Sequence, residues 1–333
     1  MGLEDFEIGT IAQPLMISFD TRYSYGFDQG LNVFYSVNFY KVTGTPFVWN
    51  GQDYQQFWTV NYQGTTTIES TTSAGCMWAT NGNPGFHFQN ILTVTNANPT
   101  IITTAVPHNL VTGDWVWFNE NTSADGIANL NNRSFQVTVT GATTFTIALN
   151  SAALAIGNNG MFQTLTSSGI TPTEDGIRWY DGDPAGGAAP HTLGWVNFSP
   201  PLSNSLTPEY LVAAKTIIAF KNRLLCLGVY IRTSAASPGA QYYPNRVVYS
   251  QVGLPFYTNP LPFNISTLTP QPEAWYQSSA GRGGFLTAPI LEEVVTVSQN
   301  EDILICGFEF QKLKLIATGD DSLPFIFQTI NSE

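Results

Sequence analysis

The acidic residues that could bind a metal ion gather in one short segment. Asp175, Asp181 and Asp183 lie with Glu174 around two glycines. Carboxylate oxygens on a tight turn are suitable ligands for Ca²⁺. The segment lacks the EF-hand loop pattern with its bidentate glutamate, and Asp-Gly turns explain the same residues without a metal. Asp175, Asp181 and Asp183 are therefore candidate calcium ligands set against a simpler interpretation as turn residues, and we expect no cofactor.

The sequence contains no motif of a known catalytic site. Neither Gly-x-Ser-x-Gly, which marks the nucleophile of α/β-hydrolases, nor His-Glu-x-x-His, which binds zinc, occurs. Glu292-Glu293 and Glu301-Asp302 could imitate the two carboxylates of a glycosidase. Neighbours in a strand point to opposite faces, so we interpret these pairs as charges at sheet edges. The histidines stand alone and are interpreted as structural (His87, His108 and His191), so we expect no catalytic residues and no enzymatic activity.

Strands must position these residues, and the clearest ones lie in the centre of the chain. Residues 211–220 and 224–230 are apolar runs separated by a polar turn. Their β-branched and aromatic residues, with Gly228 inside the second run, favour two buried strands over one helix. Asn222-Arg223 precedes the second strand, and Asn245-Arg246 precedes another. One pattern thus occurs twice within a single sheet-like unit.

Short apolar runs with turn signals continue over most of the sequence. They predict an all-β fold, either a β-propeller or a sandwich. We divide it into residues 57–97, a first propeller-like part, and residues 164–333, its remainder. Residues 1–56 are rich in aromatic side chains. They form either an arm that packs on a neighbouring subunit or an ordinary first sheet layer.

Residues 98–163 have a different pattern of apolar and polar residues and are interpreted as an inserted small β-barrel or hairpin domain. Phe135, Val137 and Val139 alternate with polar residues, and the alternation resumes at Phe145 after a Thr-Gly-Ala turn. A period of two on both sides of a turn predicts a half-buried hairpin. The matching turn signals on either side of the segment are typical of a strand pair interrupted by an insertion.

Three stretches of the sequence resemble a known family. "KNRLLCLG", "NRVVYSQVGLPFYTN" and "EDILICGFEFQKLKLIATGDDSLPFIFQTINSE" resemble blade segments of the tail nozzle, or tail tubular, and tail stabilisation proteins of short-tailed bacteriophages. The resemblance runs from Phe57 to the last residue. Within the insertion, "HNLVTGD", "LNNRSFQVT" and "TTFTIAL" resemble the first catalytic cysteine half-domain of ubiquitin-activating enzymes, a module that recurs in phage tail proteins. Nozzle proteins usually continue beyond this point, so we leave open whether the propeller is complete.

The resemblance implies a structural virion protein of a bacteriophage tail. By this resemblance, such a protein would form a homo-oligomeric ring, a hexamer, below the portal and its adaptor. The ring would be a conduit for genome ejection, with transient passage of double-stranded DNA, and a platform for tail fibres. It would be assembled in the host cytoplasm and located in the virion tail. The alternatives are a receptor- or glycan-binding tail protein, which would bind sugars without forming a ring, and a glycoside-active propeller.

The composition agrees with extensive permanent contacts. Only 11% of the residues are charged, against roughly 25% in typical soluble domains, and charged side chains are depleted at interface cores. A stable extracellular β protein with a Thr- and Asn-rich face is the alternative. The net charge of -12 disfavours tight duplex binding, which needs lysines and arginines. In a DNA passage, an acidic wall would let the duplex slide.

The cysteines and the apolar segments limit the cellular location. Cys76, Cys226 and Cys306 offer no disulfide framework, and the last two lie in apolar runs typical of buried thiols. The first residues carry acids and no apolar core, so we expect no secretory signal. No apolar stretch approaches the roughly 20 residues that span a bilayer. We therefore expect assembly in a reducing cytoplasm and no stable membrane insertion.

Overall fold

The structure, a computed structural model, describes residues 2–6, 15–20, 23–28, 32–36, 49–52, 55–62, 76–85, 87–166, 175–180, 195–233, 239–257 and 271–330. Almost all regular structure in these ranges is β, which confirms the all-β prediction. The exceptions are the helix α1 (Ala124–Asn129) and the 3-10 helix η1 (Pro272–Trp275). Neither of these helices is long enough to cross a membrane.

Four antiparallel four-stranded sheets and one closed barrel make up the described fold. The first sheet contains β1 (Gly2–Phe6), β2 (Leu15–Phe19), β3 (Ser24–Asp28) and β4 (Val33–Ser36). The second contains β5 (Trp58–Asn61), β6 (Met77–Thr80), β13 (Ile177–Tyr180) and β14 (Val196–Phe198). The third contains β15 (Glu209–Phe220), β16 (Arg223–Thr233), β17 (Gln241–Tyr249) and β18 (Gly284–Thr287). The fourth contains β19 (Val294–Asn300), β20 (Ile303–Phe308), β21 (Lys312–Ala317) and β22 (Phe325–Thr329).

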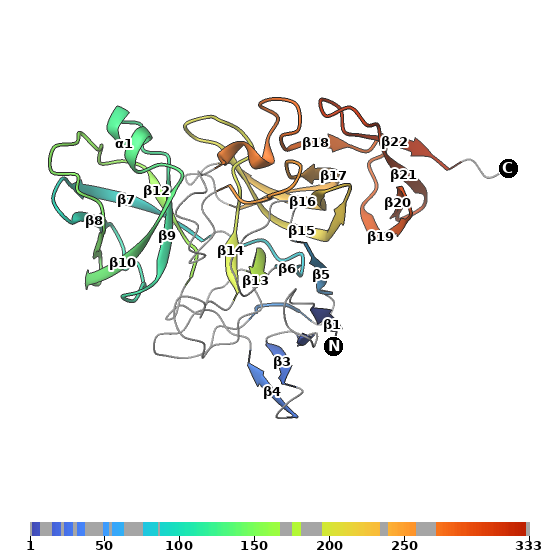
Figure 1. The fold of residues 1–333 in the computed structure, drawn as a ribbon, viewed down its shortest axis with the longest axis horizontal. Coiled ribbons are helices and arrows are strands. Elements are labelled where there is room, and N and C mark those ends of the chain that lie inside the picture. Colours follow the sequence, from blue (N-terminus) through green and yellow to red (C-terminus); the bar gives the residue numbers. More distant parts are fainter. Residues whose placement is uncertain are drawn as a thin grey trace.

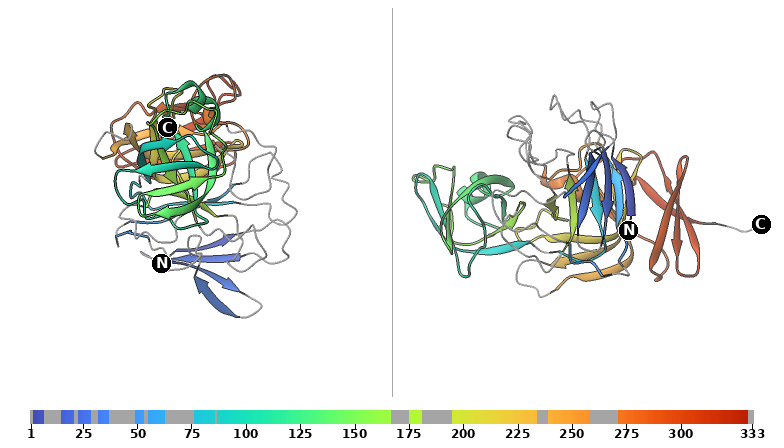
Figure 2. Two further views of the ribbon diagram at one scale, coloured as in Figure 1. Left: turned by 90° about the vertical axis from the view of Figure 1, so that its left-hand side faces the viewer. Right: turned by 90° about the horizontal axis from the view of Figure 1, so that it is seen from below.

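Successive sheets pack on one another in chain order. Phe19 and Trp49 share a core with Tyr180 and Trp195, which joins the first sheet segment to the second sheet. The second and third sheets share another core, and the third and fourth sheets share a third one. The barrel lies at one end of the molecule and the fourth sheet at the other (Figure 1). A view from below shows the same order (Figure 2).

The third sheet is covered on both faces, and its sequence explains why. In β16, Leu224 and Cys226 belong to the core shared with the second sheet, whereas Leu225 and Leu227 belong to the core shared with the fourth. A strand buried on both faces reads as a continuous apolar run. The predicted strand pair around residues 211–230 is thus confirmed.

The polar turn between β15 and β16 has the expected chemistry. Lys221 and Asn222 have φ angles of 49° and 56°, and two consecutive left-handed residues match the right-handed twist of a hairpin. Arg223 then turns inward and donates to the carbonyl oxygens of Ser250 and Arg282 at 2.7 and 2.8 Å. At Asn222-Arg223 the pattern therefore combines a turn residue with a buried anchor. Asn245-Arg246, which we expected to precede a strand, instead lies inside β17.

The barrel interrupts the second sheet between β6 and β13. Trp78 of β6 pairs directly with Trp179 of β13, so the strands on either side of the insertion lie next to each other. The barrel strands follow the order β10-β11-β8-β7-β12-β9. Their bounds are β7 (Phe88–Thr95), β8 (Thr100–Thr104), β9 (Trp115–Asn119), β10 (Arg133–Gly141), β11 (Thr144–Ile147) and β12 (Met161–Thr164).

The barrel starts earlier than the sequence division at residue 98. Its strand β7 begins at Phe88 and pairs with β8 and β12. The turn at Thr80-Asn81-Gly82 does not join two strands of one hairpin, because β6 and β7 belong to different sheets. The predicted hairpin around residues 135–149 is confirmed as β10 and β11. The short helix α1 was not predicted; Ser123 caps it by accepting from the Gly126 amide at 3.1 Å.

Two further interpretations gain a structural outcome. The described part of residues 1–56 forms a sheet layer whose core side chains contact the same chain, and packing of this segment on a neighbouring subunit stays a prediction. The acidic pairs do not lie on strands: Glu292-Glu293 precedes β19, and Glu301-Asp302 forms the β19–β20 turn. They form ion pairs with lysines of the third sheet and its β15–β16 turn instead: Glu293 contacts Lys215 at 3.0 Å and Asp302 contacts Lys221. Closure of the four sheets around one axis, as in a propeller, stays a prediction.

Candidate functional site

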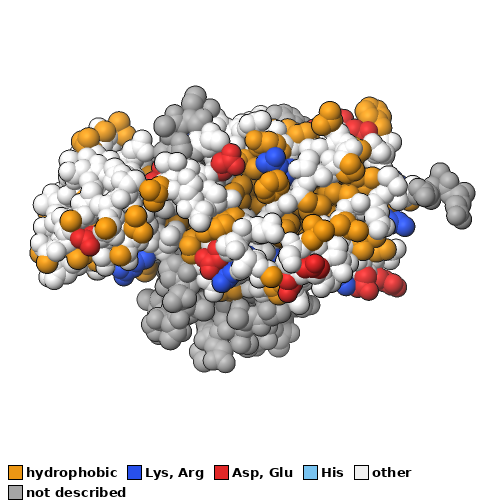
Figure 3. Space-filling model, turned by 90° about the horizontal axis from the view of Figure 1, so that it is seen from above, with side chains coloured by type: hydrophobic (Ala, Val, Ile, Leu, Met, Phe, Trp, Pro, Cys, Tyr) orange, Lys and Arg blue, Asp and Glu red, His pale blue; other side chains and the backbone are white. Residues whose placement is uncertain are grey.

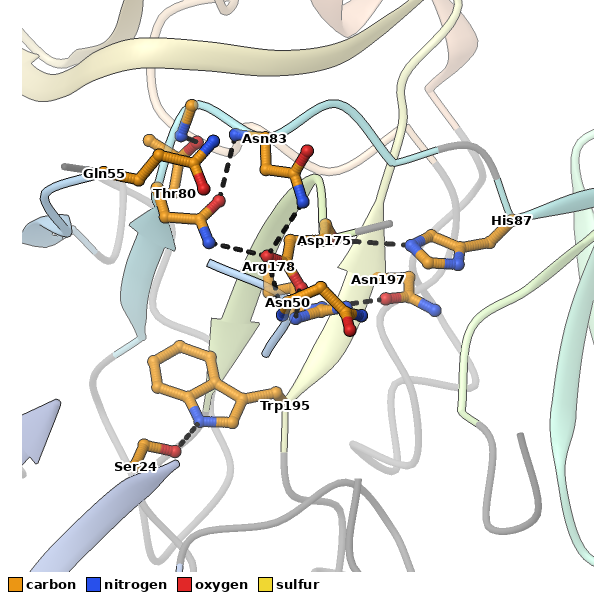
Figure 4. A network of polar contacts seen from close by, with 12 residues as sticks. Ser24, Asn50, Gln55, Thr80, Asn83, His87, Asp175, Arg178, Trp195 and Asn197 are labelled. Atoms are coloured by element: carbon orange, nitrogen blue, oxygen red, sulfur yellow. Dashed lines mark hydrogen bonds and ion pairs between the residues drawn. The ribbon is translucent and has the colours of Figure 1, made fainter. Parts of the chain in front are cut away.

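A buried polar cluster lies where the second sheet meets the loop that follows β6 (Figure 4). We call it the Asp175 cluster; it contains Asn50, Asn81, Asn83, His87, Asp175, Arg178 and Asn197. These residues come from four separate stretches of the chain. The cluster therefore fixes the N-terminal segment, the approach to the barrel and the return from it at one point.

Asp175 is the centre of this cluster. Its side chain is fully buried, and its two carboxylate oxygens accept from the Asn50 amide at 2.8 and 3.0 Å. The side-chain amides of Asn81 and Asn83 donate to Oδ2 at 2.6 and 3.3 Å. Buried carboxylates need such donors, since an unpaired buried charge is very costly.

Arg178 supplies the compensating positive charge. Its Nη1 lies 3.6 Å from Asp175 Oδ1, and both side chains have no exposed surface. Nε donates to Asn197 at 3.1 Å, and the guanidinium lies 4.2 Å from the centre of the Trp49 ring. Burial lowers the pKa of Arg178 to about 9, against the opposing attraction of Asp175. Burial thus disfavours the charged form of Arg178, and the attraction of Asp175 partly offsets this cost.

His87 borders the cluster without joining the carboxylate. Its Nε2 lies 3.3 Å from the backbone oxygen of Asp175. Burial and the nearby Arg178 lower the pKa of His87 to about 3. The ring is therefore neutral at physiological pH, and Nε2 carries the proton that it donates to the carbonyl. His108 is fixed in the barrel in a similar way, with Nδ1 accepting from the Leu110 amide at 3.0 Å.

The geometry of the Asp175 cluster suits structural anchoring. The side chains that contact the carboxylate offer N–H donors, so a cation would have to displace them. Asp181, Asp183 and His191 lie outside the described residues, and the calcium hypothesis stays a prediction. Within the described ranges, no group of three or more His, Cys, Asp or Glu side chains could hold a metal ion.

A second set of contacts seats the barrel on the sheets. Phe88, Trp117 and Met161 of the barrel belong to the core shared by the second and third sheets. Asn119 donates to the Tyr210 hydroxyl at 3.0 Å, and that hydroxyl donates to Glu120 at 2.9 Å. Burial raises the pKa of both Tyr210 and Glu120. The inserted barrel is thus packed against the rest of the chain through apolar and polar contacts.

The fourth sheet presents large apolar side chains to solvent. Leu291 is 93% exposed and Phe310 is 87% exposed. Glu292 accepts from the Phe310 amide at 3.0 Å and from the Gln311 side chain at 2.9 Å, which fixes the β20–β21 turn. Seen from above, hydrophobic side chains gather toward the end that carries β18 and the fourth sheet (Figure 3). We call Leu291 and Phe310 the apolar tip.

Sequence reasoning found part of this arrangement. It singled out Asp175 and His87, but not Arg178 or the asparagines that surround Asp175. One signal was present: Arg178 interrupts an otherwise apolar strand, and a charge in that position needs a buried partner. The cysteines agree with the prediction for their strands, because Cys226 and Cys306 are fully buried, and Cys76 is buried and free as well.

Comparisons with known proteins add little. No family model matches the chain. No curated protein matches it either. Among solved structures, the chain is similar to a phage phi92 endosialidase, with 12% sequence identity and a TM-score of 0.23. The match covers 97% of this chain and 62% of that one, so this chain spans less than two thirds of its length. A TM-score this low supports no conclusion about fold or function.

Proposed function

We propose that this chain is a structural protein of a bacteriophage tail. In the finer form of the proposal, copies of it form the nozzle or tubular ring through which the genome leaves. The observation that carries the proposal is that the segments with blade-like motifs fold as four-stranded antiparallel meanders stacked in chain order. That is the building unit of propeller-like proteins. The proposal places the protein in the virion tail after assembly in the host cytoplasm.

The apolar tip is the proposed contact between subunits. A side chain that is almost fully exposed gains free energy when a neighbour covers it, and Glu292 holds the tip in one conformation, which reduces the entropy lost on binding. A ring arises when one patch of each copy contacts a different patch of the next. The portal, its adaptor and the tail fibres are the further partners in this proposal.

The net negative charge of the chain supports a passage that DNA crosses without stable binding. With 24 acidic and 12 basic residues, the chain has few groups to neutralise phosphates. Duplex affinity falls when few lysines and arginines contact the backbone. In the proposed ring, DNA would slide through without stable binding.

The first experiment is native mass spectrometry with negative-stain imaging of the purified protein, alone and mixed with the portal complex of its virus. A ring in either sample is the expected result. Leu291→Ser and Phe310→Ser should reduce ring formation, whereas Leu92→Ser should not, because Leu92 is 53% exposed on the barrel, at the opposite end. A protein that stays monomeric with the portal would refute the proposal.

Receptor or glycan binding is a second candidate function, favoured by a groove on the third sheet that is described next. Glycoside activity stays a less favoured hypothesis. Hydrolysis of a saccharide that is lost on replacing one Asp or Glu would support it.

A further inference from the structure

A groove of about 790 Å³ lies against the third sheet. Strands β17 and β18, the helix η1 and the loop before β15 line it. Ligand sites of small molecules have volumes of roughly 300–1,000 Å³ and combine aromatic walls with a few polar groups. This groove has both, because Trp275, Tyr276 and Phe285 line it together with Arg246 and Glu209.

Arg246 is held in the groove by two aromatic rings. Its guanidinium carbon lies 3.9 Å from the centre of the Tyr243 ring and 4.7 Å from that of Phe285. Such contacts orient the planar guanidinium by its faces. The N–H donors on its edge then remain for an acceptor that approaches in the same plane.

The described residues form no hydrogen bond with the Nε of Arg246, which is buried. The ion pairs of the described residues engage Arg178, Arg223, Arg282 and two lysines, and not Arg246. Arg223 and Arg282 also donate hydrogen bonds to carbonyl or side-chain oxygens. A buried donor without a partner is costly.

The rest of the groove indicates what kind of ligand would fit. Phe285 is 61% exposed and offers a flat apolar surface next to Arg246. Ser203, Asn204, Gln277 and Ser278 add neutral polar groups that suit hydroxyls. Glu209 also lines the groove, and its charge, with the net charge of -12, opposes a ligand with many negative charges such as a nucleic acid.

We propose that the groove binds a saccharide that carries a carboxylate group. Arg246 would receive the carboxylate through two parallel N–H···O bonds, the geometry that a guanidinium fork favours. Phe285 would pack against the apolar face of a sugar ring, and Glu209 would accept from its hydroxyls. The proposal does not depend on ring assembly.

The test is an array of oligosaccharides, with and without carboxylates, probed with the full chain. Binding to at least one carboxylate-bearing glycan is expected, and titration calorimetry with that glycan then gives its affinity. Arg246→Gln should weaken it roughly 10- to 100-fold, the loss expected for a hydrogen bond to a charged group. Phe285→Ala should weaken the affinity for the same glycan several-fold. Arg133→Gln, which removes an exposed arginine from the barrel, should leave it unchanged.

A change on the ligand keeps the test independent of folding. Reducing the carboxylate of the same glycan to a hydroxymethyl group should weaken binding to wild-type protein as much as Arg246→Gln does. Equal binding of the acidic and reduced glycans, or an array without any bound acidic glycan, would overturn the proposal. Binding of an acidic peptide that depends on Arg246, with no acidic glycan bound, would show that the ligand class is wrong.

Discussion

Replacing Asp175 by Asn tests whether the buried ion pair holds the second sheet together. The asparagine has nearly the same shape but no charge, so Arg178 is left buried beside a neutral amide. The NH₂ group of the new asparagine also faces N–H donors of Asn50, Asn81 or Asn83, from which the carboxylate of Asp175 accepts hydrogen bonds. The change therefore removes charge compensation and hydrogen bonds together.

The size of the effect follows from the geometry. At 3.6 Å and an effective dielectric constant of about 20, Coulomb's law gives an attraction of about 4.6 kcal/mol. Breaking a buried pair on one side typically costs about 3–5 kcal/mol, since the remaining charge stays desolvated. We expect the free energy of unfolding of Asp175→Asn to fall by this amount. Urea unfolding at pH 7, followed by tryptophan fluorescence, measures it.

A double-mutant cycle separates the pair from general disruption. Arg178→Met and the double variant complete the cycle, with methionine filling part of the space of the arginine stem. We expect the double variant to be several kcal/mol more stable than the sum of the single losses predicts, because neither charge is then left alone. A loss below about 1 kcal/mol for Asp175→Asn, or strict additivity, would refute the reasoning.

Three further predictions follow from other parts of the chain. The pKa of His87 is about 3 in the folded state and 6.5 in the unfolded chain, so the unfolded chain binds the proton first as the pH falls. The free energy of unfolding should therefore fall by up to about 1.4 kcal/mol per pH unit between pH 6.5 and 3. In His87→Gln, the urea midpoint should lose this part of its pH dependence. Gly228→Ala should cost about 1–3 kcal/mol beyond the strain of its φ of 58°, because the new Cβ would lie 2.8 Å from Val294 Cγ1; Gly239→Ala, with φ 82° and open space around it, is the control, and equal losses would contradict the steric argument. The three buried cysteines should react with a thiol reagent only after urea unfolding, since burial raises the pKa of two of these thiols; fast labelling of the folded protein would contradict the structure.

Local patterns were enough to predict the strands whose partners are close in sequence. The hairpins β10–β11 and β15–β16 follow from alternation and from apolar runs on either side of a turn. The start of the barrel could not be predicted in this way. The apolar and polar residues of strand β7 alternate, as they would in a strand of the barrel or of the second sheet. Its pairing with β12 joins residues more than sixty positions apart. Register over such distances depends on which faces become buried.

The Asp175 cluster shows the same limit for side chains. Asp175 accepts from Asn81, which is 94 residues away, and from Asn50, which is 125 residues away. An Asp-Gly turn is visible in the sequence, but nothing local distinguishes a solvated turn from one enclosed by three separate segments. Arg178 inside an apolar strand was the available signal. Reading it together with the preceding aspartate would have predicted an ion pair with i,i+3 spacing.

The two proposals use different elements of the same chain, so variants can separate them. The apolar tip lies in the segments that flank β19 and β20, whereas Arg246 and Phe285 lie on β17 and β18. If assembly alone were the role of this chain, Leu291→Ser would reduce ring formation and Arg246→Gln would change nothing measurable. If the groove binds an acidic saccharide, Arg246→Gln should weaken glycan binding roughly 10- to 100-fold while ring formation stays intact. A virus that carries Arg246→Gln should then assemble normally and attach less to cells that display such glycans, and equal attachment would confine the chain to a structural role.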